Sequence, residues 1–202
     1  MLVDLTVKEF LAETASESPA PGGGSAAALA GALGAALAVM VANLSEGNEE
    51  IVRLRERGGS YLSEFEAFID RDTEAFNAVM ASYRRPKNTG EEKKERSEAI
   101  QTALKSAASS PMSIAELCVR VIRLALEALK AGSSNAASDA ASAGCMAHAG
   151  FWAAVYNVRI NLKSIKDEEF NAEMRKKTAE LIRKAEALIT ELSKTADEKA
   201  GL

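Results

Sequence analysis

The sequence predicts an all-α fold, a bundle of long helices with no β-sheet, and two observations carry this prediction. Apolar residues recur at spacings of three and four along most of the chain, which is the period of an amphipathic helix. Helix-breaking residues are sparse: the four prolines stand at expected loops or helix starts, and no Asn-Gly hairpin signal occurs. A chain of 202 residues, 47% hydrophobic and 27% charged, is expected to form one domain over residues 1–202.

The first two predicted helices flank a loop rich in proline and glycine. A short helix follows Thr6, because Glu9 three residues later completes a capping box. Residues 18–24, SPAPGGG, form the loop. A second helix then covers about residues 25–44, a stretch without charge that is long enough to span a membrane. Its alanine and glycine content gives little transfer free energy, so a helix buried among other helices is favoured and no membrane partner is expected.

The third and fourth predicted helices are separated by a loop at residues 85–90. The third covers about 49–84, after a break at Gly47-Asn48, and Gly58-Gly59 is its weak point. Its apolar stripe contains Phe65, Phe68, Ile69, Phe76, Val79 and Met80, with Asp72 in line. Thr89 or Gly90 leads into a charged helix over 91–109.

Three more helices complete the predicted bundle. Pro111 suits the first turn of a helix capped by Ser110, and Gly132-Ser133-Ser134 ends that helix. An alanine-rich helix continues to about Lys166, and the last begins near Asp167. The stripe of the last helix is Leu181, Ile182, Ala185, Leu188, Ile189 and Leu192.

Charge and composition narrow the possible partners. The net charge is −4, from 25 basic and 29 acidic residues, which argues against nucleic acid because phosphate binding needs a basic face. The opening MLVDLTVKEF lacks the basic and apolar regions of a signal peptide, so a cytoplasmic protein is expected. Cys118 and Cys145 stand in apolar helical surroundings and are expected to be small buried hydrophobes.

The glycine run is the first candidate binding element. Residues 22–27, GGGSAA, formally match G-x-G-x-x-A, but Ser and Pro precede them instead of a strand, and no Gly-Lys-Ser/Thr follows. Neither a Rossmann site nor a P-loop is therefore expected. The exposed amides of Gly22, Gly23, Gly24 and Ser25 at a helix start can still hold an anion or a polar ligand edge. The alternative is that the glycines only permit a tight turn and close helix contact.

Three polar positions are candidates for a site. Asp72 lies on an apolar stripe, where a carboxylate must be hydrogen-bonded, paired or facing a pocket. Asn135 and Asp139 are four residues apart and share one helix face. Asn157 repeats the angular position of Asp139 about 27 Å further along the helix, so one compact pocket uses both only if a second chain supplies one of them. Alternatively, Asn157 and Asn161 cap or bridge neighbouring helices.

The remaining candidates are weaker. His148 is the only histidine, and no second histidine or cysteine lies at metal-ligand spacing beside it, so no metal is expected and His148 is taken as a packed residue. No Gly-x-Ser-x-Gly elbow supports a catalytic triad. Arg84, Arg85 and Lys87 form a solvated loop or, alternatively, bind a carboxylate tail.

We predict that Gly22–Ser25, Asp72, Asn135 and Asp139 line one cleft at a subunit interface. Each feature has a structural explanation alone, but a pocket explains all of them together. Small-residue seams at 26–38 and 140–154 suit close helix contact between subunits, so a two-fold homodimer is expected.

Residues 18–37, SPAPGGGSAAALAGALGAAL, closely resemble the opening of the formiminotransferase-cyclodeaminase/methenyltetrahydrofolate cyclohydrolase family. The similarity continues in order through Asp72-x-x-Ala75-Phe76, Pro86-Lys87, the Pro111 helix, Asn135-x-x-Ser138-Asp139 and Asn157-Val158-x-Ile160-Asn161-Leu162. The resemblance implies an all-helical, dimeric enzyme that acts on a one-carbon unit carried by tetrahydrofolate, without metal or redox cofactor.

The resemblance also implies roles for the candidate residues. Asp72 or Asp139 would stabilise a cationic carbon and take a proton, and the other candidates would bind the folate: Gly22, Gly23, Gly24, Ser25, Lys87, Asn135 and Asn157. Two positions depart from the expected family pattern, where asparagine is expected at Ser133 and lysine at Asn48. They favour an alternative, a non-catalytic folate-binding or helical scaffold protein that keeps the fold.

Overall fold

The computed structural model describes residues 1–200, and in that part of the chain helices are joined by short loops and no strand occurs. The prediction of an all-α bundle is confirmed. The elements are η1 (Leu2–Asp4), α1 (Val7–Thr14), α2 (Gly23–Asn43), α3 (Glu49–Tyr83), α4 (Gly90–Ala131), η2 (Ser134–Ala136), α5 (Ala137–Leu162) and α6 (Glu168–Ala200).

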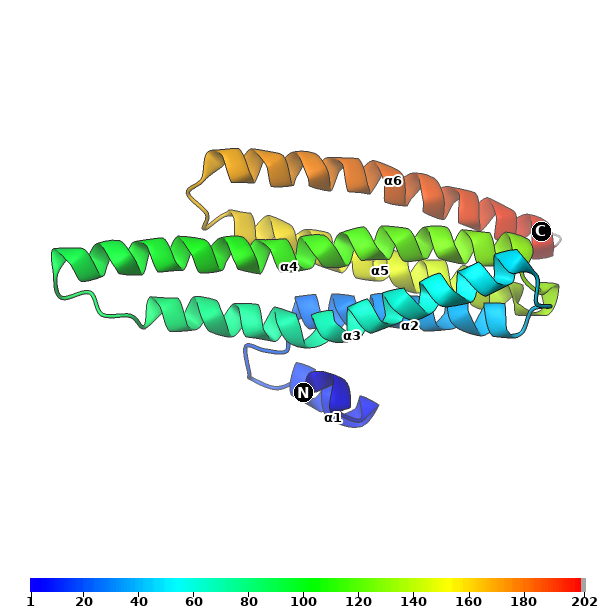
Figure 1. Ribbon diagram of the computed structural model, residues 1–202, viewed down its shortest axis with the longest axis horizontal. Helices are drawn as coiled ribbons and strands as arrows, with labels where there is room; N and C mark the ends of the chain where they lie inside the picture. Colours follow the sequence, from blue (N-terminus) through cyan, green and yellow to red (C-terminus); the bar gives the residue numbers. More distant parts are fainter. Residues whose placement is uncertain (201–202) are drawn as a thin grey trace.

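The five long helices lie roughly along one axis (Figure 1): α4 contacts each of the other four, and α2 contacts α3, α4 and α5. Glycines allow α2 and α5 to approach backbone to backbone. A β-carbon on Gly34 would come within 2.7 Å of the Ala143 carbonyl oxygen, and one on Gly150 within 2.7 Å of the Ala27 carbonyl oxygen. The small-residue seams on these helices therefore pack against each other within one subunit.

The apolar helix α2 is the one described helix with the length and hydropathy to span a membrane, and 56% of its apolar window is buried inside the bundle. Ala27, Ala28 and Ala35 are fully buried among the other helices. These contacts fit the interpretation of α2 as a core helix.

Local capping signals are correct predictors of helix starts. Thr6 and Glu9 form the predicted capping box at α1, and Thr89 forms a second one at α4. The Asn48 side chain accepts a hydrogen bond from the Ile51 amide at the start of α3, at 3.0 Å. Asp167 does the same for the Phe170 amide at the start of α6, at 3.0 Å.

The predicted boundary at Pro111 is wrong, because α4 continues through it from Gly90 to Ala131. Proline has no N–H to donate to the carbonyl oxygen four residues earlier, that of Ala107. The Asn161 side chain on α5 supplies the missing donor, with its Nδ2 at 2.7 Å from the Ala107 oxygen. A tertiary hydrogen bond thus replaces the lost helical one, and Ser110 is inside the helix and caps nothing.

Three smaller expectations also need correction. Helix α3 is unbroken at Gly58-Gly59. Gly58 allows α3 to pack closely on α2, because a β-carbon there would crowd Val39. Helix α5 ends at Leu162, four residues before the expected end. Cys118 is buried as expected, but Cys145 is exposed.

The N-terminal segment lies outside the bundle, beside α2 and α3 (Figure 1). The Leu2 amide donates to the Asp70 Oδ1 on α3 at 2.6 Å, and the Phe10 side chain is 7% exposed. Serine hydroxyls then link the end of α1 to the following loop: Ser16 Oγ accepts from the Ser18 amide, and Ser18 Oγ donates to the Ala20 carbonyl at 2.6 Å. The segment is therefore tied to α3 near its start and leads directly to the glycine run.

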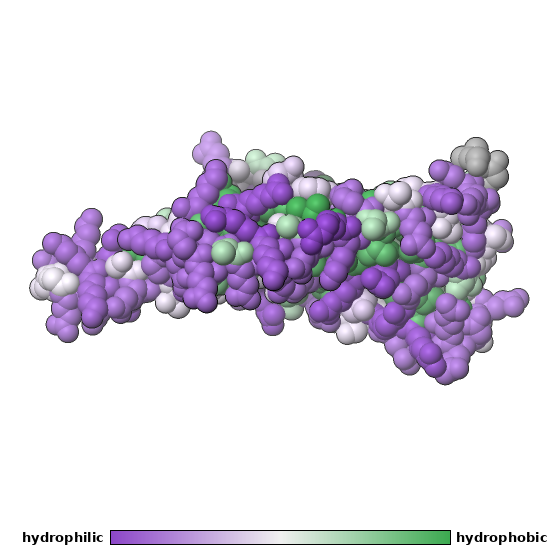
Figure 2. All heavy atoms as spheres, turned by 90° about the horizontal axis from the view of Figure 1, so that it is seen from above, coloured by the Kyte–Doolittle hydropathy of each residue, from purple (hydrophilic) through white to green (hydrophobic). Residues whose placement is uncertain are grey.

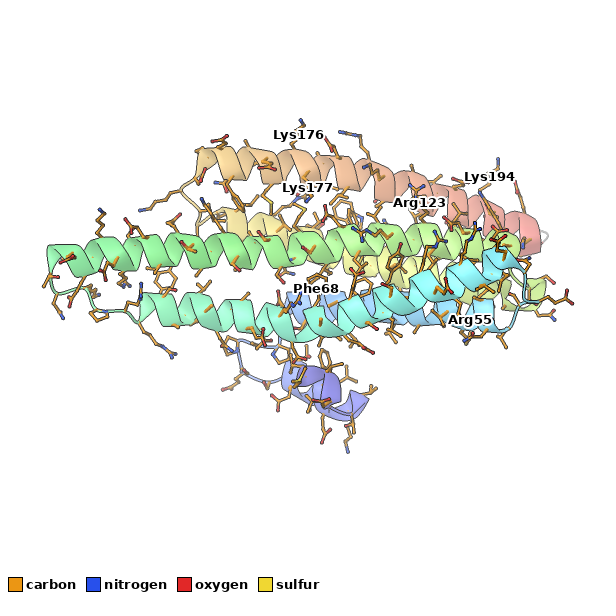
Figure 3. The ribbon with its side chains drawn as sticks, in the orientation of Figure 1. Arg55, Phe68, Arg123, Lys176, Lys177 and Lys194 are labelled. Atoms are coloured by element: carbon orange, nitrogen blue, oxygen red, sulfur yellow. The ribbon has the colours of Figure 1, made fainter. Side chains whose placement is uncertain are left out.

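The outer surface is hydrophilic, especially at the tip formed by the α3–α4 turn, while hydrophobic residues show between hydrophilic ones in the middle of the face in Figure 2. Charged side chains of α6 reach neighbouring helices. The Nζ of Lys177, for example, lies 2.7 Å from the Oε1 of Glu116 on α4. Lys176 and Lys194 instead project from the side of α6 that faces away from the bundle (Figure 3).

Candidate active site

A cavity of about 330 Å³ lies at the N-terminal end of α2, where α3, α4 and α5 meet the glycine loop. Its walls combine loop backbone, apolar side chains and a few polar groups. The lining residues are Pro19, Ala20, Gly22, Gly23, Asp72, Thr73, Ala75, Phe76, Val79, Leu104, Ala107, Asn157 and Asn161. A mostly apolar cavity with a few convergent polar groups is typical of a small-molecule site.

Asp72 enters the cavity from α3 and faces the first turn of α2. A β-carbon on Gly24 would overlap the Asp72 carboxylate, so only glycine leaves room for it there. The buried Ser25 Oγ donates to the Ile69 carbonyl oxygen at 2.8 Å and lies 3.5 Å from Thr73 Oγ1. Both explanations of the glycine run therefore apply: it permits close contact between α2 and α3, and it places the loop backbone at the cavity.

Desolvation by burial raises the pKa of Asp72, and a hydrogen bond from the Ser25 backbone amide opposes that rise in part. Among the described residues that line the cavity, Asp72 is the one charged group, and no lysine or arginine accompanies it. A carboxylate held without a cationic side chain is available to a positively charged ligand.

Two asparagines of α5 add hydrogen-bond acceptors to the wall. Asn157 Nδ2 donates to the Ala153 carbonyl at 2.9 Å, and Asn161 Nδ2 donates to the Ala107 carbonyl at 2.7 Å. One N–H of each amide is engaged by a backbone carbonyl, which fixes the orientation of the side chain, so its oxygen and its second N–H remain for a ligand. The cavity thus suits a molecule with N–H donors or positive charge and a flat apolar body.

The structure brings together only some of the predicted site residues. Gly22, Gly23, Asp72 and Asn157 line the cavity, Gly24 lies behind Asp72, and Ser25 is buried against α3. Asn135 lies in η2 and Asp139 in the first turn of α5. Both are at the opposite end of α2 from the cavity, because the neighbouring Ser133 amide donates to the Oγ of Ser45, which follows the C-terminal end of α2, at 2.8 Å. Lys87 is exposed in the α3–α4 loop and does not line the cavity.

The predicted single cleft is therefore absent within one subunit. The physical reason is that α5 spans the bundle: it places Asp139 at one end and Asn157 about 27 Å away at the other, which is the separation expected for 18 helical residues. Asn135 and Asp139 can join the Asp72 cavity only from a second copy of the chain.

The whole helical domain matches a known family. Residues 6–198 match the family described as formiminotransferase-cyclodeaminase. This chain belongs to that family. A methenyltetrahydrofolate cyclohydrolase from Methylorubrum extorquens is 39% identical over 203 residues, covering 97% of this chain and 98% of that protein.

Other members of the family agree with the fold. The crystal structure of formiminotetrahydrofolate cyclodeaminase from Thermotoga maritima superimposes with a TM-score of 0.87 at 30% identity, covering 98% of both chains. The formimidoyltransferase-cyclodeaminase of Rattus norvegicus is 33% identical over 191 residues, which are 91% of this chain but 35% of the rat protein. This chain therefore spans about a third of the rat relative.

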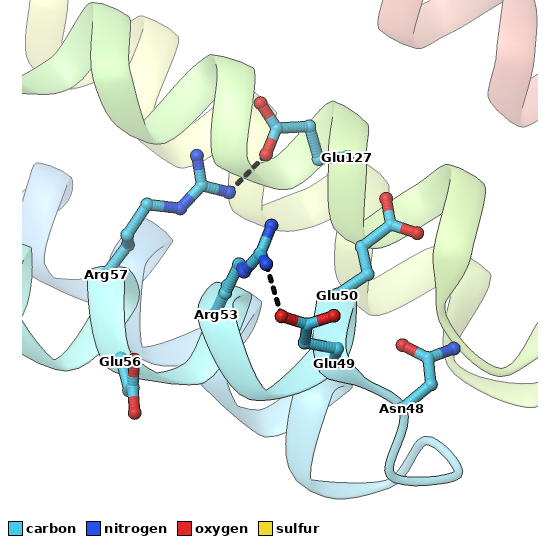
Figure 4. A pocket seen from close by; sticks show the side chains of 7 residues that line it. All are labelled: Asn48, Glu49, Glu50, Arg53, Glu56, Arg57 and Glu127. Atoms are coloured by element: carbon cyan, nitrogen blue, oxygen red, sulfur yellow. Dashed lines mark hydrogen bonds and ion pairs between the residues drawn. The ribbon is translucent and has the colours of Figure 1, made fainter.

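The two departures from the expected family pattern, Asn48 and Ser133, do not line the Asp72 cavity. Asn48 borders a wider hollow at the start of α3, together with Glu49, Glu50, Arg53, Glu56, Arg57 and Glu127 (Figure 4). There Arg53 pairs with Glu49 and Arg57 pairs with Glu127. Glu50 and Glu56 have no such pairing among the ion pairs of the described residues, so the hollow is an acidic surface and not a cavity like that of Asp72.

Sequence reasoning missed Thr73 and gave Asn161 only a structural reading. Asn161 follows Asn157 by four residues, so a shared helix face was the signal available. His148, by contrast, is a packed residue as expected: its Nε2 lies 2.9 Å from Glu186 Oε1, which also accepts from Trp152 Nε1 at 2.9 Å. The His148 hydrogen bond is the main cause that lowers the pKa of Glu186, and the group links α5 to α6.

Proposed function

We propose that this chain is a folate one-carbon enzyme that hydrolyses the methenyl bridge of methenyltetrahydrofolate, with Asp72 as the general base. One observation carries the proposal: the cavity contains a single desolvated carboxylate and no basic side chain, which complements a cationic substrate. The relative of matching length, 39% identical over nearly the whole chain, is a methenyltetrahydrofolate cyclohydrolase and supports the same reaction.

The proposed reaction needs water and side chains only. The methenyl carbon is part of a cationic amidine, and Asp72 as carboxylate stabilises that charge. Water adds to the carbon while its proton passes to Asp72, giving a neutral tetrahedral adduct. One carbon–nitrogen bond then breaks: the leaving ring nitrogen takes the proton from Asp72, the hydroxyl group of the adduct loses its own proton to solvent, and a neutral formyl group remains on the other nitrogen. The raised pKa of Asp72 makes it a better base than an exposed aspartate.

A second candidate is cyclodeamination of formiminotetrahydrofolate. The Thermotoga maritima cyclodeaminase, with its TM-score of 0.87, supports it. In this reaction a folate nitrogen adds to the formimino carbon and the carbon–nitrogen bond to the departing group breaks. Ammonia leaves with one proton from the attacking nitrogen and one from protonated Asp72. The same cavity serves both reactions, because each passes through a cationic carbon between the same two nitrogens.

We further propose a homodimer formed through α2 and α5. Six large apolar side chains are exposed on these two adjacent helices and at the end of α2: Leu33 45%, Met40 36%, Leu44 62%, Met146 36%, Tyr156 61% and Ile160 55%. An apolar surface of this kind is typical of a protein interface. In an antiparallel two-fold dimer, the α5 start of one subunit would lie near the Asp72 cavity of its partner, which would bring in Asn135 and Asp139.

The deciding experiment follows loss of the methenyl absorption with purified protein against the spontaneous rate, in parallel with ammonia release from formiminotetrahydrofolate. We expect faster decay of the methenyl signal, and ammonia release in place of it would select the second reaction. A protein that binds both folates in a titration without turning over either would be a non-catalytic binder and would contradict the proposal.

The shared site is tested by mixing subunits. Asp72→Asn and Asp139→Asn homodimers are expected to be weakly active. If each site uses residues of two subunits, hybrids made by unfolding and refolding a mixture regain one intact site in two. Random pairing would then restore about a quarter of the parental turnover. No recovery, with dimers present by light scattering, would place both acids in the same subunit's site or Asp139 outside it.

A further inference from the structure

The helical hydrogen bond that α4 lacks at Pro111 would have been made beside the candidate active site. Proline at this position leaves the Ala107 carbonyl without its helical donor, and Ala107 lines the Asp72 cavity. This carbonyl still has a hydrogen-bond donor, because Asn161 Nδ2, 54 residues later in the sequence, lies 2.7 Å from its oxygen. The proline therefore creates a docking point for one particular side chain of α5.

This hydrogen bond fixes how the Asn161 amide is turned. A carbonyl oxygen accepts only, so the Asn161 side chain must present its NH₂ group to Ala107 and keep its Oδ1 for other partners. Asn161 itself lines the cavity, one turn beyond Asn157, whose NH₂ group is likewise engaged by the Ala153 carbonyl. The two side-chain oxygens and the Asp72 carboxylate give the cavity three acceptor groups.

We infer that Asn161 is a substrate-contacting residue whose Oδ1 accepts an N–H of the bound heterocycle, and that Pro111 is the positioning residue that orients it. The inference rests on the proposed function for the identity of the ligand and deepens it by assigning a specificity contact. An asparagine free to rotate would present NH₂ or oxygen alike. The freed Ala107 carbonyl removes that choice before the ligand arrives, which lowers the cost of ordering the side chain on binding.

Two single variants and their combination test the inference. Asn161→Leu removes the acceptor and the bond to Ala107 with little change in volume. Pro111→Ala restores an N–H that competes with Asn161 for the Ala107 carbonyl. We expect KM to rise about tenfold for Asn161→Leu, the scale of one lost hydrogen bond, and about threefold for Pro111→Ala, with kcat changed by less than about threefold in both.

The KM of the double variant distinguishes a positioning role of Pro111 from a merely structural one. If Pro111 acts through Asn161, Pro111→Ala should have no effect on KM in the Asn161→Leu background. The unfolding midpoint of Pro111→Ala should stay unchanged or rise, because a helix-interior proline is removed. Independent, multiplied effects on KM, or an unchanged KM in Pro111→Ala, would overturn the inference. If Asn161→Leu does not fold, Asn161→Ala takes its place.

Gln101→Ala is the matched control. Gln101 is another side-chain amide that joins α4 to the chain after α5, donating to the Ser164 carbonyl at 3.3 Å and accepting from the Lys166 amide at 2.8 Å, but it does not line the cavity. We expect its loss to affect the unfolding midpoint and leave KM unchanged.

A binding titration with tetrahydrofolate distinguishes failure of the proposed function from failure of the inference about Asn161 and Pro111. If the parent protein neither binds nor converts folates, the proposed function fails and the ligand assignment fails with it. The Pro111–Asn161 coupling is still measured by the unfolding midpoints of the same four proteins. If the parent is active and the coupling is absent, the inference alone is wrong.

Discussion

An aspartate lies at each end of the packed helices α2 and α5, Asp72 of α3 at one end and Asp139 of α5 at the other, and the surroundings of the two differ. At the start of α2, Asp72 is desolvated against a glycine turn, and burial raises its pKa. At the start of α5, Asp139 occupies the first turn of a helix, where a carboxylate is favoured by the helix dipole. The comparison teaches that the surroundings of a carboxylate set its proton affinity: at Asp72, solvent, cationic partners and the β-carbon of the facing residue are all missing.

The largest expected effect is the loss of turnover in Asp72→Asn, and stability is the property that separates this variant from Asp139→Asn. Asp72→Asn keeps the side-chain shape and removes the base, so turnover should fall about 10²- to 10⁴-fold. Because the folded state raises the pKa of Asp72, its charged form is disfavoured on folding, and the stability this group contributes is lost as pH rises through that pKa. The variant should therefore unfold at the same or a higher temperature at pH 7.

Asp139→Asn is the matching measurement at the other end. Removing the acid from the first turn of α5 should lower stability by about 0.3–1 kcal/mol. Thermal unfolding and turnover measured on both variants decide the comparison. If Asp72→Asn instead loses stability and keeps its turnover, Asp72 is a helix brace and the contrast between the ends disappears.

Gly24→Ala should disturb the Asp72 end without changing any charge. The new methyl group would overlap the carboxylate and push it from its place, and a displacement of about 1 Å can cost about 10²-fold in rate. The measurement is kcat/KM for the variant against the parent. Full activity would show that the Asp72 carboxylate does not act from the position described here.

The pH dependence of kcat/KM sharpens the contrast further. The proposed hydrolysis needs Asp72 deprotonated, so the rate should fall about tenfold per pH unit below its pKa. Since desolvation raises that pKa, the acid limb should lie above the range of an ordinary exposed aspartate. A limb at the usual position, or one that persists in Asp72→Asn, would assign the titration to another group.

The smallest expected effect concerns a glycine away from both ends. A β-carbon on Gly59 meets no atom within 4 Å, and the residue lies inside α3. Gly59→Ala should therefore stabilise the protein by about 0.5–1 kcal/mol through helix propensity and leave turnover unchanged. Denaturant unfolding measures the gain, and a loss of stability would mean that α3 needs flexibility there.

The sequence predicts the helices and their caps because those features depend on residues close together in the chain. The capping boxes at Thr6 and Thr89 use partners three residues away. The continuation of α4 through Pro111 depends instead on Asn161, 54 residues later, and no local pattern contains that contact.

The candidate site divides in the same way. The oddity of Asp72 and the 27 Å separation of Asp139 from Asn157 follow from helical geometry alone. Which of those two joins Asp72 depends on the direction in which α5 packs against α2, and this is a property of the folded bundle.

Two neighbouring aspartates of α3 hold both ends of the N-terminal segment, since Asp70 accepts a hydrogen bond from the Leu2 amide and Asp72 accepts one from the Ser25 amide. Residues 2–25 thus form a loop closed at both ends on α3, and Phe10, Pro21 and Ser25 are its buried side chains. Such a loop can open as a local unit while the bundle stays folded, on a free-energy scale below that of global unfolding. Because Pro19, Ala20, Gly22 and Gly23 line the cavity, we expect the affinity for a ligand in it to depend on this local equilibrium. A substitution that loosens the loop would weaken binding in a protein whose melting temperature is normal.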